Sequence, residues 1–228
     1  MEKLFIPVKY KKELTEKFMD GVNEKICNKV GLFTTTQFTN QLIQLKEFLE
    51  KKEKCVFIGE SNYRATEKGQ VLGCDINSPL SISENVDCFL YLGTGYFHSI
   101  LLSMNTKKPI FQANPLAEFI KEVDKKEVER YVTLKKNTIA KAKKAKKMGI
   151  LVCTKFGQEN LEIAKKIKKK LDEKNKKAYI FLFETLAPEE LLNFPDIEAW
   201  INTACPRISI DDIERFDKPV VNWEDING

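Results

Sequence analysis

The 228-residue sequence lacks several features that would narrow its function at once. Its six cysteines show no C-x-x-C spacing, so no single segment encodes a zinc ribbon or a thioredoxin-like redox site. No hydrophobic run approaches the roughly 20 residues that span a bilayer. The first residues lack the apolar core and cleavage site of a signal peptide. We therefore expect a cytoplasmic protein that does not associate with a membrane, and in which thiols stay reduced.

Histidine and arginine are also scarce. His98 is the sole histidine, which gives little support to a Ser-His-Asp triad. The formal net charge is +5, and 38 residues are basic. Only four of these are arginines: Arg64, Arg130, Arg207 and Arg215. Proteins that read grooves and phosphates usually exploit the forked guanidinium group, so we expect no direct contact with nucleic acid.

Short β-branched or apolar runs alternate with helical stretches, and this alternation occurs twice. In the first half, strands are expected at residues 29–34, 55–59, 87–92 and 109–112. Helices are expected between them at residues 37–51, 78–84 and 96–104. After a helical segment at about 125–147, strands are expected at residues 149–153, 178–183, 197–202 and 219–222, with a helix at 158–174. Such alternation is typical of parallel sheets with right-handed crossovers.

The two halves also contain similar short sequences at corresponding positions. The strand that contains Gly31 parallels the strand that contains Gly149, and Lys-Pro-Ile at 108–110 parallels Lys-Pro-Val at 218–220. The pattern predicts an α/β fold of two similar domains that arose by internal duplication, each with a small parallel four-stranded sheet flanked by helices. The expected divisions are an N-terminal strand and helix segment (1–26), a first domain (27–124), and a linker helix with the second domain (125–228).

Four unusual loops are expected directly after strands, where parallel sheets bind their ligands. They are Thr-Thr-Thr-Gln at 34–37, Gly-Thr-Gly-Tyr-Phe-His at 93–98, Thr-Lys-Phe-Gly-Gln at 154–158 and Thr-Ala-Cys-Pro-Arg at 203–207. A Gly-x-Gly pair lets backbone amides approach an anionic group. Helix capping by threonine is the simpler interpretation of the loops at 34–37 and 154–158, and a hydrogen-bonded structural residue is the simpler interpretation of His98. The sequence identifies no catalytic residue.

Two cysteines stand in distinct settings. Cys74 lies in Val-Leu-Gly-Cys-Asp at 71–75, where the glycine allows the backbone to bend. Cys205 follows a strand, and Arg207 beside it adds positive potential, which favours the thiolate form that ligates metals. A buried structural cysteine is the alternative for Cys205. Asp75 either caps the next helix or orients a ligand, and capping is the simpler role.

These motifs resemble those of the archaeal-type diphthamide synthase family, the 2-(3-amino-3-carboxypropyl)histidine synthases. The resemblance covers the chain from about residue 29 to 224, and its motifs follow one another in the same order as in the family. These motifs lie at residues 33–37, 71–75, 93–98, 154–158 and 202–212. It corresponds to the second and third of three similar domains, so the chain looks like a form that lacks the first. Family members hold a [4Fe-4S] cluster with three cysteines. They cleave S-adenosylmethionine to a 3-amino-3-carboxypropyl radical that adds to a histidine of translation elongation factor two.

By resemblance, Cys74 and Cys205 would be two cluster ligands, and the strand-end loops would hold the co-substrate S-adenosylmethionine. Residues implied in that binding are Thr35, Gln37, Gly93, Gly95, His98, Lys155 and Gln158. The resemblance leaves the third ligand open. A separately encoded first domain or a paralogous subunit would supply it, which we favour, or Cys153 would stand in.

The favoured function is therefore a component of a transferase that depends on an iron-sulfur cluster and S-adenosylmethionine, is completed by another subunit, and acts on elongation factor two. A non-catalytic companion of that enzyme and a generic nucleotide-binding α/β module are the alternatives.

Overall fold

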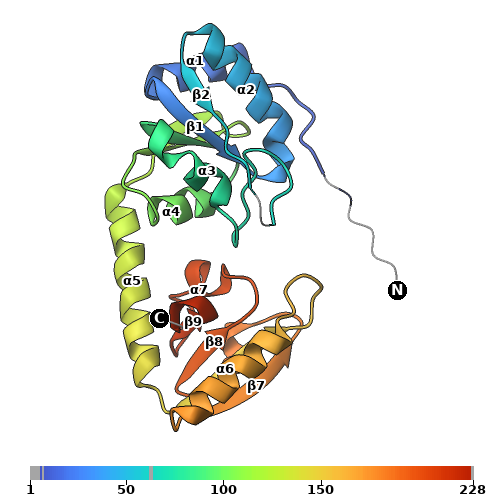
Figure 1. Ribbon diagram of the computed structural model, residues 1–228, viewed down its shortest axis with the longest axis vertical. Coiled ribbons are helices and arrows are strands. Elements are labelled where there is room, and N and C mark those ends of the chain that lie inside the picture. The colour runs from blue at the N-terminus through green and yellow to red at the C-terminus, as the bar shows by residue number, and fades with distance from the viewer. Residues whose placement is uncertain (1–5, 7, 62–63, 227–228) are drawn as a thin grey trace. The chain divides into compact units, whose positions relative to one another are not determined.

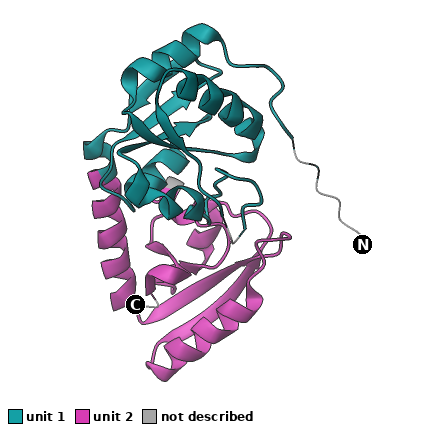
Figure 2. Ribbon diagram, turned by 45° about the horizontal axis from the view of Figure 1, so that its top comes forward, with its two compact units in different colours: residues 1–128 teal, residues 129–228 magenta. Residues whose placement is uncertain are grey.

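The computed structural model describes residues 6, 8–61 and 64–226. It divides into unit 1, Met1–Val128, and unit 2, Glu129–Gly228, which Figure 2 draws in teal and magenta. Each unit is built on one sheet with helices beside it (Figure 1), so the α/β fold class is confirmed. Within the described residues, no helix has both the length and the hydrophobicity to cross a bilayer.

Unit 1 contains a five-stranded sheet in the order β2-β1-β3-β4-β5. The strands are β1 (Lys29–Thr34), β2 (Cys55–Phe57), β3 (Cys88–Leu92), β4 (Ile110–Asn114) and β5 (Phe119–Glu122). The first four are parallel, as the sequence predicts, whereas β5 runs antiparallel to β4 and was not anticipated. It arises because the Asn114 side chain accepts hydrogen bonds from the amides of Leu116 and Ala117, which turns the chain back on itself.

The helices of unit 1 are α1 (Glu16–Lys25), α2 (Thr39–Lys51), α3 (Asn77–Ser81) and α4 (Phe97–Ser103). Helix α1 begins at a cap in which the Thr15 hydroxyl accepts from the Phe18 amide. Its apolar side joins α2 on the sheet face formed by Val30 and Leu32, residues that alternate along β1. The expected segment 1–26 thus supplies a helix to the core of unit 1. Of the strand expected there, residues 1–5 and 7 lie outside the described residues.

Unit 2 contains a parallel four-stranded sheet in the order β7-β6-β8-β9. Its strands are β6 (Lys147–Cys153), β7 (Lys177–Phe183), β8 (Ala199–Asn202) and β9 (Val220–Asn222). Helix α5 (Lys125–Lys144) begins in unit 1 and continues into unit 2, which also contains α6 (Leu161–Glu173) and α7 (Ile208–Asp211). Short 3-10 turns are η1 (Thr36–Phe38) and η2 (Ser83–Asn85) in unit 1, and η3 (Pro188–Asn193) and η4 (Trp223–Ile226) in unit 2. The order second-first-third-fourth recurs in both units, which agrees with internal duplication.

A glycine and an aromatic ring occupy the same place in each repeat. Gly31 of β1 pairs with Phe89 of β3, and Gly149 of β6 pairs with Trp200 of β8. A methyl group on Gly31 would lie 2.7 Å from the phenylalanine ring, and one on Gly149 would lie 2.3 Å from the tryptophan ring. The shared glycine therefore reflects close packing against the neighbouring strand.

Cys27 and Cys88 form a disulfide with their Cα atoms 6.1 Å apart. The expectation that all thiols are reduced is therefore wrong for this pair. Cys27 lies two residues before β1, and Cys88 opens the adjacent β3 with Val30 as its register partner. Parallel pairing thus brings together two thiols that are 61 residues apart in the chain. Their Cα separation lies within the range that a disulfide bridges.

Candidate functional site

The four polar loops lie where the sequence analysis expected them. They follow β1 and β3 in unit 1, and β6 and β8 in unit 2. Both strands of each pair are hydrogen-bonded neighbours in the interior of a sheet. Two polar loops therefore emerge side by side at the carboxyl edge of each sheet, the usual ligand position in parallel α/β folds.

Cys74 lies in a long connection between β2 and α3, residues 58–76, which we call the cysteine excursion. Its backbone extends the sheet at the end of β1, because the Thr34 amide donates to Gly69 O and the Val71 amide donates to Thr34 O, both at 2.8 Å. Two further backbone bonds between Leu72 and Asp75, at 2.8 and 3.1 Å, close a tight turn with Cys74 inside it. The Cys74 side chain is exposed, so its thiol is available to a ligand.

Asp75 organises the cysteine excursion from within. Its side chain is 3% exposed, yet it accepts four hydrogen bonds. One oxygen, Oδ2, accepts from the Ser61 hydroxyl at 2.7 Å and from the amides of Arg64 and Ala65 at 2.8 and 3.0 Å. The other, Oδ1, accepts from the Asn77 amide at 3.1 Å, at the first turn of α3. The N-cap position of α3 is Ile76, so Asp75 lies one residue before the position that a cap would occupy and binds the first helical amide from there. The same side chain also binds Ser61, Arg64 and Ala65.

Burial raises the pKa of the Asp75 carboxyl, but the hydrogen bonds from Ala65, Ser61, Arg64 and Asn77 outweigh it and hold the pKa below its ordinary value. The group is therefore a carboxylate at neutral pH. Since Asp75 is adjacent to Cys74 in the chain, this carboxylate fixes the turn that presents the thiol.

Arg64 contacts the candidate ligand directly. Its Nη1 atom lies 3.6 Å from the Cys74 sulfur, within hydrogen-bond range for a sulfur acceptor. Sequence reasoning missed this residue as part of the site, because ten residues of irregular chain separate the two side chains. The available signal was the scarcity of arginine in a lysine-rich sequence.

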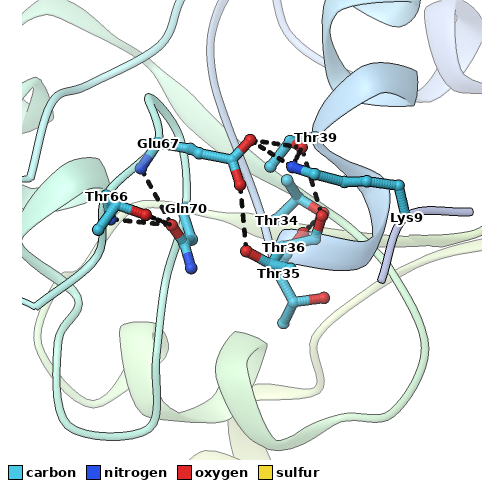
Figure 3. A network of polar contacts seen from close by, with 8 residues as sticks. All are labelled: Lys9, Thr34, Thr35, Thr36, Thr39, Thr66, Glu67 and Gln70. Carbon is cyan, nitrogen blue, oxygen red and sulfur yellow. Dashed lines mark hydrogen bonds and ion pairs between the residues drawn. The ribbon is translucent and has the colours of Figure 1, made fainter. Parts of the chain in front are cut away.

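Glu67 ties the cysteine excursion to the loop after β1 (Figure 3). Its carboxylate accepts from the Lys9 ammonium group, from the Thr39 hydroxyl at 2.9 Å and from the Thr36 hydroxyl at 3.2 Å. Burial raises the pKa of Glu67, but these three partners together keep it below its ordinary value. Two of the threonines near residues 34–37 are therefore engaged in holding the excursion, a structural use that the sequence could not show.

The remaining loop residues of unit 1 are at the expected edge. Thr35 is half-buried and precedes η1, and Gln37 is exposed, with its backbone carbonyl accepting from the Tyr10 amide at 2.7 Å. Gly95 has a φ of +76° with open space where a side chain would be, so this backbone is accessible and suits glycine. Its carbonyl accepts from the Gln112 amide group at 2.8 Å.

His98 lies in the first turn of α4. Its Nδ1 atom is 3.3 Å from the Tyr91 hydroxyl, and the two rings are 5.5 Å apart. This arrangement matches the simpler interpretation of a hydrogen-bonded structural histidine. Gly93 begins the same loop, and its amide donates to Ala113 O at 2.9 Å, which extends the pairing between β3 and β4.

In unit 2, the loop after β6 is exposed. The Lys155 ammonium group donates to the Thr185 hydroxyl at 3.1 Å, and the Gln158 amide donates to Lys155 O at 3.1 Å. The sequence predicted that a helix begins at Gln158, but α6 begins three residues later, at Leu161. Cys153, the alternative third ligand, is 1% exposed. Its sulfur accepts from the Lys155 amide at 3.4 Å and contacts Glu184 O at 3.7 Å, so the thiol is enclosed at the end of β6.

Cys205 lies in the loop between β8 and α7 and is half-buried. A buried asparagine pair supports this loop: the Asn202 amide group donates to Cys205 O and to Asn222 Oδ1, both at 2.8 Å. Asn202 Oδ1 accepts from the Ala204 amide at 3.0 Å. The same two asparagines stand at the ends of the paired strands β8 and β9, so the sheet itself fixes the backbone of the cysteine loop.

The donor chemistry of these loops suits part of an iron-sulfur site. Thiolates on loops are the usual ligands of such clusters, and the exposed Cys74 and the half-buried Cys205 are free thiols on loops held by hydrogen bonds. Among the described residues, no group of three or more histidine, cysteine or acidic side chains is close enough to hold a metal ion. The structure describes each cysteine loop within its own unit, and each offers one thiolate.

The fold and these loops define a duplicated α/β protein that presents one thiol from a hydrogen-bonded loop in each repeat. A family model described as "Putative diphthamide synthesis protein" matches residues 1–227, so the chain belongs to that family.

Relatives of known name agree with this assignment. The 2-(3-amino-3-carboxypropyl)histidine synthase of Pyrococcus horikoshii is 32% identical over 225 residues, which covers 98% of this chain and 64% of the relative. Subunit 1 of the corresponding synthase from Caenorhabditis elegans is 30% identical over 214 residues, 89% of this chain and 51% of the relative. The chain thus spans between about half and two thirds of the length of these two proteins.

A solved structure also resembles the chain. The crystal structure of Dph2 from Pyrococcus horikoshii with a 4Fe-4S cluster matches with a TM-score of 0.83 and 32% sequence identity. The match covers 98% of this chain and 64% of that one.

Proposed function

We propose that the chain is a component of a diphthamide synthase, which transfers a 3-amino-3-carboxypropyl group from S-adenosylmethionine to a histidine of translation elongation factor two. The observation that carries the proposal is the pair of free thiols, Cys74 and Cys205, each on a loop held by hydrogen bonds, in a chain similar to a Dph2 that contains a 4Fe-4S cluster. In this proposal the two thiolates are cluster ligands. The cluster, when bound, supplies the electron that cleaves the sulfonium.

The polar loops at the sheet edges would hold the co-substrate. Gly95 leaves backbone accessible for the carboxylate of its amino-acid part, and Lys155 offers a cation on an exposed loop. Gly93 is buried with its amide bonded to Ala113 O, so it would contribute by shaping the same loop. Thr35, Gln37, His98 and Gln158 are further candidates for contact with the nucleoside. His98 already bonds Tyr91, so it would act by fixing the loop and not as a base.

A second subunit is proposed to supply the third thiolate. Of the six cysteines, Cys27 and Cys88 are joined to each other, and Cys55 opens β2 at the opposite end of the sheet from the polar loops. Cys153 is buried and hydrogen-bonded through its sulfur. To act as a ligand, it would have to leave the end of β6. That leaves Cys74 and Cys205, one thiolate short of the set of three.

Anaerobic reconstitution with iron and sulfide tests this proposal. The isolated chain should retain little iron, whereas its assembly with a copurified subunit that contributes a cysteine should bind one four-iron cluster. Iron and sulfide analysis and the visible absorption of the cluster provide the readouts. A stable, stoichiometric four-iron cluster in the isolated chain, retained in a Cys153→Ala variant, would contradict the need for a partner.

The second candidate is a non-catalytic companion of that enzyme, which would need neither thiol as a ligand. The two candidates differ in the effect of thiol removal. If the chain supplies ligands, Cys74→Ala and Cys205→Ala should each abolish transfer to elongation factor two in the assembled enzyme. Full activity of both variants would favour the companion. Cys55→Ala, at the other end of the sheet, is the matched control and should leave activity unchanged.

A further inference from the structure

Arginine is rare in this chain, and two arginines accompany the two candidate ligands. The sequence has four arginines among 38 basic residues. Arg130 and Arg215 make ion pairs with Glu214 and Asp212. The other two are Arg207, two residues after Cys205, and Arg64, which contacts the Cys74 sulfur.

The position of Arg64 is fixed from its backbone. Its amide donates to Asp75 Oδ2 at 2.8 Å, while its Nη1 atom lies 3.6 Å from the sulfur of Cys74. The buried Asp75 carboxylate therefore holds both partners of this contact, one through a hydrogen bond and the other through the chain. The guanidinium group is permanently charged and less strongly hydrated than an ammonium group, so it suits a contact with a polarisable sulfur anion.

We propose that Arg64 is a positioning residue that keeps its guanidinium group on the Cys74 sulfur when this thiolate ligates the cluster, and thereby raises the reduction potential of the cluster. The inference rests on the proposed function. Hydrogen bonds to ligand sulfurs and the net charge around a cluster are known to set its potential. On reduction, the cluster takes one electron from an external one-electron donor, and no bond forms or breaks. A cation beside a ligand sulfur stabilises the more negative product.

The cysteine excursion contains its own control for this effect. Lys68 is a second cation of the same segment, but its ammonium group pairs with Glu60 at 2.6 Å, and both side chains are largely exposed. Removal of the Lys68 charge therefore changes the net charge of the excursion by the same amount without touching the Cys74 contact.

The experiment is a redox titration of the assembled enzyme, reconstituted anaerobically with iron and sulfide and reduced with dithionite. Electron paramagnetic resonance of the reduced cluster gives the midpoint potential of the wild type and of Arg64→Gln, Arg64→Lys and Lys68→Gln. We expect a more negative potential in Arg64→Gln, equivalent to a three- to tenfold lower equilibrium constant for reduction. A tenfold change is about 59 mV for a one-electron couple. Arg64→Lys should restore part of the shift, and Lys68→Gln should match the wild type.

Arg64→Gln keeps the backbone amide that binds Asp75, so the excursion should stay folded and the iron content unchanged. Equal potentials in Arg64→Gln and the wild type, or an equal shift in Lys68→Gln, would overturn the inference while leaving the proposed function intact. If the wild-type assembly binds no cluster, the proposed function itself fails and the inference falls with it.

Discussion

Asp75 is the residue whose replacement tests most directly how the cysteine excursion is held. In Asp75→Asn the side chain keeps its shape but loses its charge and one of its two acceptor oxygens. If the amide oxygen takes the Oδ2 position, it still accepts from Ser61, Arg64 and Ala65, and the amide nitrogen then faces the Asn77 N–H. If the amide is flipped, its nitrogen, which is a donor, faces the three groups that donate to Oδ2 in the wild type. Either way, at least one hydrogen bond is lost.

The structure sets the size of the effect. Hydrogen bonds to a charged group contribute about 1.5–3 kcal/mol and neutral ones about 0.5–1.5 kcal/mol, so three weakened bonds cost roughly 1 kcal/mol each. The unsatisfied Asn77 amide costs about 1 kcal/mol more. Because the excursion is a surface segment that relaxes in part, we expect local opening to become easier by about 3 kcal/mol. This corresponds to roughly a hundredfold loss of protection against hydrogen exchange.

Native-state hydrogen exchange measures this directly at the amides of Arg64, Ala65 and Asn77, which donate to Asp75. Asp87→Asn, at an exposed position of the same unit, is the matched control and should leave these amides unchanged. Protection in Asp75→Asn within about threefold of the wild type would refute the reasoning, because Asp75 is the one side chain among the described residues that bonds all three amides.

The same carboxylate predicts a pH dependence with a defined sign. The pKa of Asp75 is lower in the folded protein than its ordinary value of 3.8, so its ionised form stabilises the fold. This contribution is fully present above pH 3.8 and is lost as the pH falls through the lower folded value. The wild type and Asp75→Asn should therefore differ most near neutral pH and converge in acid, as followed by hydrogen exchange or denaturant unfolding.

Three further perturbations follow from the fold. Cys27→Ser removes the disulfide, and the 61-residue separation implies a loss of about 4 kcal/mol in denaturant unfolding under oxidising conditions; the two proteins should converge in dithiothreitol, and equal stability in both buffers would contradict the bond. Gly149→Ala should cost about 1–3 kcal/mol because a methyl group would lie 2.3 Å from a tryptophan ring of β8. Gly157→Ala, at a φ of +77° in open space, should cost only about 1 kcal/mol, and the reverse order would argue against the packing. Glu67→Gln should lower stability by at most about 1 kcal/mol near neutral pH, since the site is partly exposed. The difference should vanish as the pH falls below 4.5, because the folded pKa lies below that value.

Much of the fold was predictable because it depends on local patterns. The strand expected at 29–34 is β1 without change, and each of the other expected strands overlaps an observed one. Most of these segments are buried apolar runs bounded by polar or turn residues, a signal that needs no tertiary information, whereas β2 and β7 are partly exposed. The missed strand β5 is short and half exposed, and its only sequence signal was the Asn114-Pro115 turn that precedes it.

The candidate site was predictable in its positions and not in its contacts. The sequence located the strand-end loops, because a parallel sheet fixes which end of each strand carries them. It could not show that Glu67 reaches Thr36 and Thr39, or that Cys153 is enclosed while Cys74 is exposed. Such contacts depend on how an irregular connection folds back, which side-chain periodicity does not record.

The sequence by itself thus determined the duplicated α/β pattern and the family resemblance, and it singled out the two cysteines that we propose as ligands, since all three depend on residue order and spacing. Tertiary structure decided which thiols are available. Register between β1 and β3 joined Cys27 to Cys88, and the hydrogen bonds of Asp75 placed Cys74 against Arg64. Both outcomes depend on atoms that lie close in space although 10 to 61 residues apart in the chain. Only the folded chain brings them together.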